Sequence, residues 1–322
     1  MRFDLPGGVV CLGETMAVLV PAGPGPVRAA RTWTRVIGGA ESNVAIHLHR
    51  LGVRSRWVGA VGDDAFGGAV LDAVGGAGVD VTGVRVDPDR PTGLYVKEAD
   101  AAGSRVRYYR RGSAASALGP DALDRLDLGA ALLVHVTGIT AALSDSCLDL
   151  LRAVLAAPRR APVSFDLNWR PALWRDRDPA VLRELADAAD VVLAGADEAQ
   201  AVWGTGDPDG LRALLPGPTT LVVKHGARGA TVVEDGATTF QPALRVDVVE
   251  PVGAGDAFAA GYLAAHLAGE PPARRLRVGH LQAASALLTR EDVGESLPSH
   301  VTAPLLDADS DTWAAAHLRR RR

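Results

Sequence analysis

The chain has 322 residues, 48% of them hydrophobic and 22% charged, with a formal net charge of −4. This composition is typical of a globular protein with a sizeable core, and the nearly balanced charge predicts no nucleic-acid partner and no attraction to a membrane surface. The only cysteines, Cys11 and Cys147, form neither a C-x-x-C pair nor a zinc motif, so we expect a reducing, cytoplasmic location. Gly13 and Glu14 interrupt the N-terminal apolar stretch, so we expect neither a signal peptide nor a membrane span.

The first helix is predicted within residues 41–52, ESNVAIHLHRLG. Val44, Leu48 and Leu51 share one face at this spacing, and Gly52 follows as a typical terminating residue. The segment is therefore expected to be an amphipathic helix that packs against a core.

A hairpin is predicted over residues 92–111, TGLYVKEADAAGSRVRYYRR, with its turn near Gly103. Because alternate strand residues point to the same side, Tyr108 and Arg110 share one face, and Tyr95 can share it from the partner strand. Such side chains are poor core material. Two interpretations stay open on the residues alone: a solvated sheet edge, or a small β lid over a binding site.

From about residue 130 onward, short apolar runs alternate with helical patterns. The runs ALLVHVTG, APVSFDLN, ADVVLAG and TTLVVKHG are rich in β-branched residues and end in turn residues, so each predicts a strand buried on both faces. Helical patterns such as SDSCLDLLRAVLAA and PAVLRELADAA lie between the earlier runs. This alternation predicts an α/β fold with a doubly wound, mostly parallel sheet.

A glycine turn precedes an apolar helix in residues 249–261, VEPVGAGDAFAAG. Gly253 and Gly255 allow a close backbone approach to a ligand, and the first N–H groups of the following helix can bind an anion. Asp256 is the only charged residue between the glycines and the apolar run. Either it acts on a ligand held there, or it caps the helix, since Asp is a favoured capping residue.

Two common phosphate-binding motifs are excluded. The chain contains no G-x-x-x-x-G-K-[ST] loop, and Phe258 occupies the third glycine position of a dinucleotide fingerprint. The glycine turn also lies late in the chain rather than after a first strand. A P-loop enzyme and a nicotinamide dehydrogenase are therefore disfavoured.

Motifs in order along the chain resemble the ribokinase-like (PfkB) carbohydrate kinase family. Residues 37–52, IGGAESNVAIHLHRLG, resemble its N-terminal glycine-pair motif, residues 57–67, WVGAVGDDAFG, resemble the segment after it, and GAGDAFAAG preceded by EPV resembles its C-terminal signature. The similarity spans roughly residues 8–300. Within the family, TGLYVKE, YYRRGSAASAL, TGIT and DLNWRPALW look like 2-keto-3-deoxygluconate kinases.

The resemblance implies a ribokinase-like fold with a β lid, and transfer of a phosphoryl group from ATP, with Mg²⁺, to a sugar hydroxyl. The implied substrate is 2-keto-3-deoxygluconate, converted to its 6-phosphate. The resemblance assigns the general base to Asp256 and an anion hole to the backbone of Gly253, Ala254 and Gly255. The implied substrate contacts are Gly38, Gly39, Asn43, Tyr95, Tyr108, Arg110, Ile139, Arg170, Asp256 and Asp292. The implied ATP contacts are Lys224, Gly226, Ala227, Gly229, Gly253, Gly255 and His280.

Arg110 and Arg170 bear on the kind of sugar. Arg170 follows the predicted strand in VSFDLN, at the carboxyl end of the sheet where open α/β folds bind ligands. Arg110 would come from the lid. Arginines can form bidentate, charge-assisted hydrogen bonds with a carboxylate, so the pair favours a sugar acid, although ordinary surface ion pairs are the alternative.

Two positions depart from the family pattern. The usual N-x-x-E reads GADE here, with Gly195 in place of Asn, while Glu198 keeps the acid and is expected to help hold Mg²⁺ through water. Before the glycines, many relatives have Asp-Thr-Thr, but this chain has Glu250, Pro251 and Val252. The missing hydroxyls put the usual monovalent-cation site in doubt.

The expected organisation is one kinase domain over residues 1–310, with lid segments at about 12–37 and 92–111, followed by a solvated basic tail over 311–322. The lid is also a candidate contact between two copies of the chain. Two other functions stay open: a kinase for another sugar, such as fructose, an epimeric deoxyketogluconate or a sugar phosphate, and a non-catalytic sugar-binding regulator. An Arg pair holds a phosphate as readily as a carboxylate.

Overall fold

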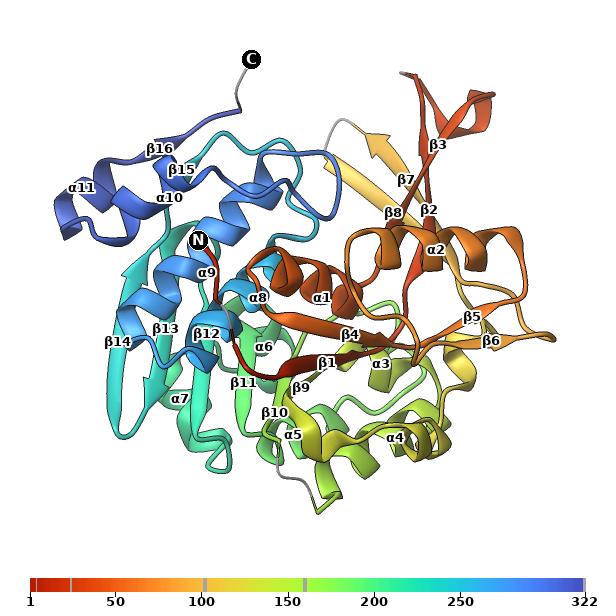
Figure 1. The fold of residues 1–322 in the computed structure, drawn as a ribbon, viewed down its shortest axis with the longest axis horizontal. Coiled ribbons are helices and arrows are strands. Elements are labelled where there is room, and N and C mark those ends of the chain that lie inside the picture. The colour runs from red at the N-terminus through yellow and green to blue at the C-terminus, as the bar shows by residue number, and fades with distance from the viewer. Residues whose placement is uncertain (4, 24, 101–102, 159–160, 321–322) are drawn as a thin grey trace.

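The computed structural model describes residues 1–322 except 4, 24, 101–102, 159–160 and 321–322. Its main sheet contains β1 (Gly8–Leu12), β4 (Arg54–Val58), β9 (Ala131–Thr137), β10 (Val163–Asp166), β11 (Val191–Gly195), β12 (Thr220–Lys224), β13 (Gly229–Glu234) and β14 (Ala237–Pro242). Among the described residues the strand order is β14-β13-β12-β11-β10-β9-β1-β4 (Figure 1). The strands from β12 to β4 run parallel, and β13 runs antiparallel to both of its neighbours. The predicted α/β fold with a mostly parallel sheet is confirmed.

Helices cover both faces of this sheet, as a doubly wound fold requires. One face carries α3 (Gly138–Leu143), α4 (Asp145–Ala156), α5 (Val181–Asp187), α6 (Ala196–Trp203) and α7 (Pro208–Leu214). The other face carries α1 (Ala40–Arg50), α2 (Ala65–Gly76), α8 (Ala254–Leu267) and α9 (Pro272–Leu287). The helix predicted within residues 41–52 is thus present as α1, with Gly52 in a left-handed conformation just after its end.

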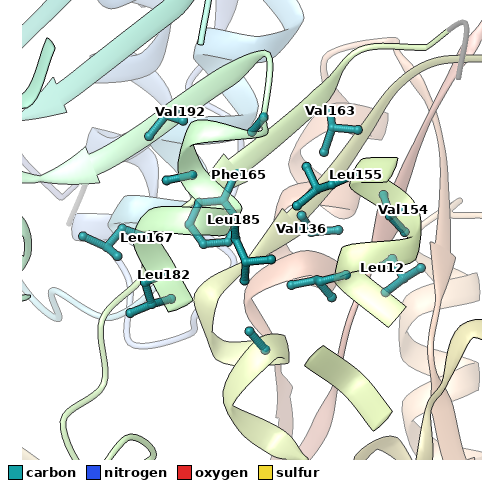
Figure 2. Packing of buried hydrophobic residues seen from close by; sticks show 14 of the residues in the cluster. Leu12, Val136, Val154, Leu155, Val163, Phe165, Leu167, Leu182, Leu185 and Val192 are labelled. Atoms are coloured by element: carbon teal, nitrogen blue, oxygen red, sulfur yellow. The ribbon is translucent and has the colours of Figure 1, made fainter. Parts of the chain in front are cut away.

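Side-chain alternation along the strands explains why the core has two halves. In β11, Val191 and Leu193 pack in the cluster that includes α1 and α8, whereas Val192 belongs to the cluster on the opposite face. Figure 2 shows part of this second cluster, where Phe165 of β10 and Leu185 of α5 are among the buried side chains. Because both faces are covered, such strands are apolar throughout, and this is the pattern that the sequence displays.

A second, four-stranded sheet stands apart from the main sheet, at the upper right of Figure 1. It contains β2 (Met16–Pro21), β3 (Trp33–Gly38), β7 (Leu94–Asp100) and β8 (Gly103–Tyr109), in the order β3-β2-β7-β8. Strands β7 and β8 form the predicted hairpin, and the turn predicted near Gly103 adjoins residues 101–102, which lie outside the described residues. Tyr95 lies opposite Tyr108, with the ring centroids 5.5 Å apart, so the predicted shared face is confirmed. That this sheet closes over a ligand or joins two copies stays a prediction.

The C-terminal segment, predicted to be a solvated basic tail over 311–322, contains regular structure as far as Leu318. Residues beyond 298 form α10 (Ser299–Leu306), α11 (Ser310–Ala315) and β16 (His317–Leu318), and β16 pairs in parallel with β15 (Arg245–Val246). Trp313 is fully buried. Most of the other described residues from 311 to 320 are exposed, so Trp313 is the side chain that attaches this segment to the core.

Two shorter features complete the description. Strands β5 (Ala60–Gly62) and β6 (Arg85–Asp87) pair in parallel beside the main sheet. Within the described residues, no helix combines the length and the apolarity that crossing a bilayer requires.

Candidate active site

A cavity of about 630 Å³ lies where the carboxyl ends of the parallel strands meet the four-stranded sheet and the start of α8. The sequence-predicted substrate residues all line it: Gly38, Gly39, Asn43, Tyr95, Tyr108, Arg110, Ile139, Arg170, Asp256 and Asp292. Glu198 and Gly253 line the same cavity. Residues that lie far apart in the sequence are thus brought to one place, although their individual roles stay predictions.

A second cavity, of about 620 Å³, lies on the other side of the start of α8. The sequence-predicted ATP residues that line it are Lys224, Gly226, Ala227, Gly229, Gly255 and His280, and Ala254 of the predicted anion hole lines it as well. Gly253, also predicted to contact ATP, lines the first cavity and not the second. The two cavities share Lys224, Gly226, Pro251 and Gly255. A ligand in one cavity can therefore meet a ligand in the other at the first turn of α8.

The start of α8 is built for close approach to a ligand. Gly253 precedes the helix with φ +84°, a left-handed conformation that favours glycine, and a Cβ there would overlap the carbonyl of Asp292. Gly255 is exposed to the cavity. The first N–H groups of a helix lack intrahelical partners, and the helix dipole adds positive potential. The rest of α8 is buried from Ala257 to Ala265, so these amides are held in place.

Asp256 does not cap the helix. It is the third residue of α8, and Gly253 occupies the capping position. Its carboxylate accepts hydrogen bonds from side chains instead: Asn43 Nδ2 donates to Oδ2 at 2.8 Å, and Asn168 Nδ2 lies 3.4 Å from Oδ1. The two asparagines hold the carboxylate toward the cavity, which supports its acting on a ligand.

The pKa of Asp256 is suited to proton transfer at neutral pH. Burial raises this pKa to about 7, although the hydrogen bond from Asn43 and the charges of Arg170 and Lys224 oppose the shift. A free Asp has a pKa of about 3.9. The Asp256 carboxylate is therefore a stronger base than that of a free Asp, and a base with a pKa near the working pH is the more efficient one.

The raised pKa predicts a pH-dependent stability. Between about pH 4 and 7 the folded state keeps the Asp256 proton that the unfolded state releases, so this group makes folding less favourable as the pH rises. Asp256→Asn removes the titration. The melting temperature of the variant minus that of the wild type should therefore rise from pH 4 to 7 and then level off. A difference that is constant across this range would contradict the raised pKa.

Lys224 supplies a positive charge where the two cavities meet. Its Nζ lies 2.8 Å from Asp166 Oδ2 and 3.0 Å from Oδ1, and a Cβ on Gly255 would lie 3.8 Å from it. Burial alone would lower the pKa of Lys224, but the charges of Asp166 and Glu198 outweigh burial and raise it. The ammonium therefore stays charged beside the anion-binding turn.

Arg110, predicted to contact the substrate, already has a charged partner within the protein. Its guanidinium forms an ion pair with buried Glu14, and it stacks on the Tyr108 ring, with Cζ 5.3 Å from the centroid. Glu14 also accepts a hydrogen bond from the Ser113 hydroxyl. Part of the charge of Arg110 is thus already balanced within the protein, because a buried cation requires a partner.

Asp292 joins the four-stranded sheet to the cavity. Tyr95 donates its hydroxyl hydrogen to Oδ2 at 2.7 Å, and Lys97 Nζ lies 2.5 Å from Oδ1. Gly38 makes room for this pair, because a Cβ there would clash with the Tyr95 hydroxyl. The loose assignment of Asp292 to the ligand cavity thus agrees with its position, and Lys97 is an additional partner that the sequence did not indicate.

Glu198 and Arg170 line the outer side of the cavity. Arg170 Nη1 lies 3.3 Å from Glu198 Oε1, and the Gly195 N–H donates to Glu198 Oε2 at 3.1 Å. Burial raises the pKa of Glu198. The side chain of Arg170 is 45% exposed, against 8% for Arg110, so Arg170 is the arginine with more freedom to meet a ligand.

Besides Lys97, the sequence reasoning missed three residues of the site: Glu14, Asp166 and Asn168. The last two lie at the carboxyl end of β10, the position at which Arg170 was recognised, so the same rule could have found them. Asn168 has φ +42°, an uncommon conformation for a residue other than glycine. No signal in the sequence marked Glu14, because its role depends on an ion pair with Arg110, which lies far away in the sequence.

Comparisons with known proteins agree with this geometry. The model of the pfkB family carbohydrate kinases matches residues 7–300. The chain is 39% identical to a 2-dehydro-3-deoxygluconokinase of Thermoproteus tenax over 90% of this chain and 91% of that one. It is 38% identical to a 2-dehydro-3-deoxygluconokinase of Bacillus subtilis over 81% and 83%. A crystal structure of a PfkB protein from Polaromonas sp. JS666 superposes with a TM-score of 0.79 at 35% identity, over 87% of this chain and 95% of that one.

Proposed function

The chain belongs to the pfkB family of carbohydrate kinases, and on that premise we propose that it transfers the terminal phosphoryl group of ATP to a sugar acid. The proposed acceptor is 2-dehydro-3-deoxygluconate, the product being its 6-phosphate. The observation that carries the proposal is the meeting of two cavities at the first turn of α8, where Asp256 and Lys224 lie. The names of the two relatives support the choice of acceptor.

In this proposal Asp256 is the general base. The acceptor hydroxyl lies against the Asp256 carboxylate in the first cavity and loses its proton to it as the oxygen attacks the phosphorus atom. Asn43 and Asn168 orient the carboxylate. Phosphoryl transfer requires little covalent chemistry from a protein, so this positioning is a large part of catalysis.

The charge on the transferred group is met by the protein's own donors. In this proposal the turn between the cavities, Gly253, Ala254 and Gly255, supplies backbone N–H donors, and Lys224 adds a full positive charge. The Ala254 N–H lies 3.4 Å from the Pro251 carbonyl and would exchange that long contact for the phosphoryl group. Donors that are already oriented stabilise developing charge without reorganising at the moment of reaction.

The proposal includes Mg²⁺, because the first cavity contains a carboxylate, that of Glu198, which can hold the ion through water. Mg²⁺ in kinases is usually held by one or two carboxylates, waters and the substrate phosphates. Within the described residues, no cluster of three His, Cys, Asp or Glu side chains forms a ready metal site. Both Glu198 oxygens already accept protein hydrogen bonds, so Glu198 would hold the ion through water. Bound Mg²⁺ would neutralise phosphate charge.

The sugar-acid assignment rests on the positive charge of Arg170, which lines the first cavity. Arg170 is half exposed and lines the same cavity as Tyr95 and Tyr108. A carboxylate there can exchange with Glu198 as the partner of the guanidinium. Charged hydrogen bonds of this kind contribute about 1.5–3 kcal/mol each.

Arg170→Ala should therefore raise KM for the sugar acid about 10- to 100-fold, with a much smaller change for a neutral ketose such as fructose. Steady-state kinetics with both acceptors at saturating ATP measure this. Arg175→Ala is a suitable control, because Arg175 is exposed and does not line the cavity. If the Arg170 variant handles both acceptors alike, the carboxylate assignment is wrong.

A substrate screen distinguishes the proposed sugar-acid kinase from two other functions, a kinase for another sugar and a non-catalytic sugar-binding regulator. A kinase for another sugar would release ADP with fructose, an epimeric acid or a sugar phosphate in preference to 2-dehydro-3-deoxygluconate. A sugar-binding regulator would bind ligand but release no ADP with any acceptor. The oriented Asp256 disfavours the regulator, because binding alone requires no base. A coupled ADP-release assay over these acceptors decides between them.

A cytoplasmic location is part of the same proposal. Cys11 and Cys147 are both free and buried, which fits a reducing compartment that also contains ATP. Fractionation of the native host, with detection of the chain, would test the location, and recovery outside the cytoplasm would contradict it.

A further inference from the structure

One residue that lines the second cavity, His317, lies beyond the family match, which ends at residue 300. Strand β16 pairs with β15 directly beside this cavity, and His317 of β16 lines it together with Leu244, Val246 and Val248. In Figure 1, α11 and β16 lie next to β15 on the side of the molecule opposite the four-stranded sheet. The C-terminal segment is thus part of the second cavity.

Trp313 holds this segment in place. Its side chain is fully buried, its indole N–H donates to the Pro242 carbonyl at 2.8 Å, and Arg277 lies over its ring at 4.9 Å. Its ring centroid is 6.4 Å from that of His280, which lines the second cavity. A backbone hydrogen bond from Asp247 to Leu318 adds a further attachment. The segment is therefore anchored, and a side chain that it presents is pre-positioned.

The His317 ring has both nitrogens engaged outside the cavity. Nε2 lies 2.7 Å from Asp247 Oδ1, and Arg319 Nη2 lies 3.2 Å from Nδ1. If Arg319 donates to Nδ1, then Nε2 carries the hydrogen and donates it to Asp247. What the imidazole can still offer to the cavity is the flat face of its ring.

The other walls of the second cavity suit a flat aromatic ligand. They are largely apolar, formed by Leu244, Val246, Phe258, Ala283 and Leu287. An apolar slot bounded by an oriented ring binds the base of a nucleotide by stacking and exclusion of water. The shared turn at Gly255 then directs the phosphates toward Lys224.

We propose that the C-terminal segment is a nucleotide-binding element in which the ring face of His317 packs against the base of ATP. The inference rests on the proposed function, because it assigns the second cavity to ATP. It adds a residue to nucleotide recognition that lies outside the matched family region.

Isothermal titration calorimetry with ATP tests this directly. His317→Ala should raise Kd for ATP about fivefold or more, since stacking of a base on an aromatic ring is lost. His317→Phe keeps a flat ring without the two nitrogens and should stay within about twofold of wild type. The KM for the sugar acid should not change in either variant. His49→Ala, an exposed histidine outside both cavities, is the matched control.

The outcomes are distinguishable. Wild-type affinity in His317→Ala would overturn the inference, and equal weakening in the Ala and Phe variants would overturn packing by the ring face. Melting temperatures within a few degrees of wild type show that the variants are folded. A wild-type chain that binds no ATP would overturn the proposed function, and this inference with it.

Discussion

Replacing Asp256 with Asn is expected to lower kcat roughly 10²–10⁴-fold, the usual range for a positioned acid or base. Asparagine keeps the shape of the side chain and can still accept the hydrogen bond from Asn43, but it cannot take the proton of the acceptor hydroxyl. ATP affinity should stay near wild type, because the backbone of Gly253 and Gly255 is unchanged. Steady-state kinetics at saturating ATP and sugar acid measure the loss.

The pH profile of the wild type belongs to the same experiment. With a pKa of about 7, Asp256 is half protonated near neutral pH. The value of kcat/KM should therefore fall about tenfold per pH unit well below pH 7.

For the Asp256 substitution, Asp209→Asn is the matched control, because Asp209 is an exposed acid in the first turn of α7, outside both cavities. A folded Asp256→Asn enzyme that retains more than about a tenth of wild-type kcat lies outside the general-base range and would leave Asp256 a structural role.

Replacing Lys224 with Met is expected to have the next largest effect. The change removes the positive charge beside the anion-binding turn, and the loss of one such donor typically costs about 10²–10³ in kcat. It also leaves Asp166, which is 2% exposed, without its partner. Breaking a buried ion pair in this way costs about 3–5 kcal/mol of stability, so unfolding could mimic a catalytic defect.

A second substitution separates the two effects. Asp166→Asn in the Lys224→Met background removes the unpaired charge and should restore much of the free energy of unfolding, measured by urea denaturation, without restoring kcat. Asp166→Asn alone is the third variant of the cycle. If the double variant recovers kcat along with stability, Lys224 has only the structural role of neutralising Asp166.

The fold was predictable because both faces of the main sheet are covered. Runs such as VVLAG in β11 are apolar at every position, and this pattern distinguishes buried parallel strands from one-sided sheets. The glycines at the start of α8 were equally informative, since Gly253 has a backbone conformation that other residues avoid. Both features depend on residues that are neighbours in the sequence, and they can therefore be predicted from it.

The remaining features depend on contacts between distant parts of the chain. Two ion pairs join segments that are far apart in the sequence: Glu14 with Arg110, and Lys97 with Asp292. The sequence alone does not show that these segments lie close together in the fold. The raised pKa of Asp256 is likewise a property of its burial. The attachment of the C-terminal segment through buried Trp313 is also a contact between distant parts of the chain, which the terminal arginines did not indicate.

The central claim is that ATP in one cavity donates its terminal phosphoryl group to a sugar acid in the other. Phosphorus-31 NMR of the wild-type chain with ATP, Mg²⁺ and 2-dehydro-3-deoxygluconate tests it most directly. The predicted result is ADP together with a new phosphomonoester whose signal is split by two protons, as a phosphate on the primary 6-hydroxyl requires, and its absence with Asp256→Asn. Formation of inorganic phosphate without a phosphomonoester, or no consumption of ATP by the folded wild-type chain, would contradict the claim.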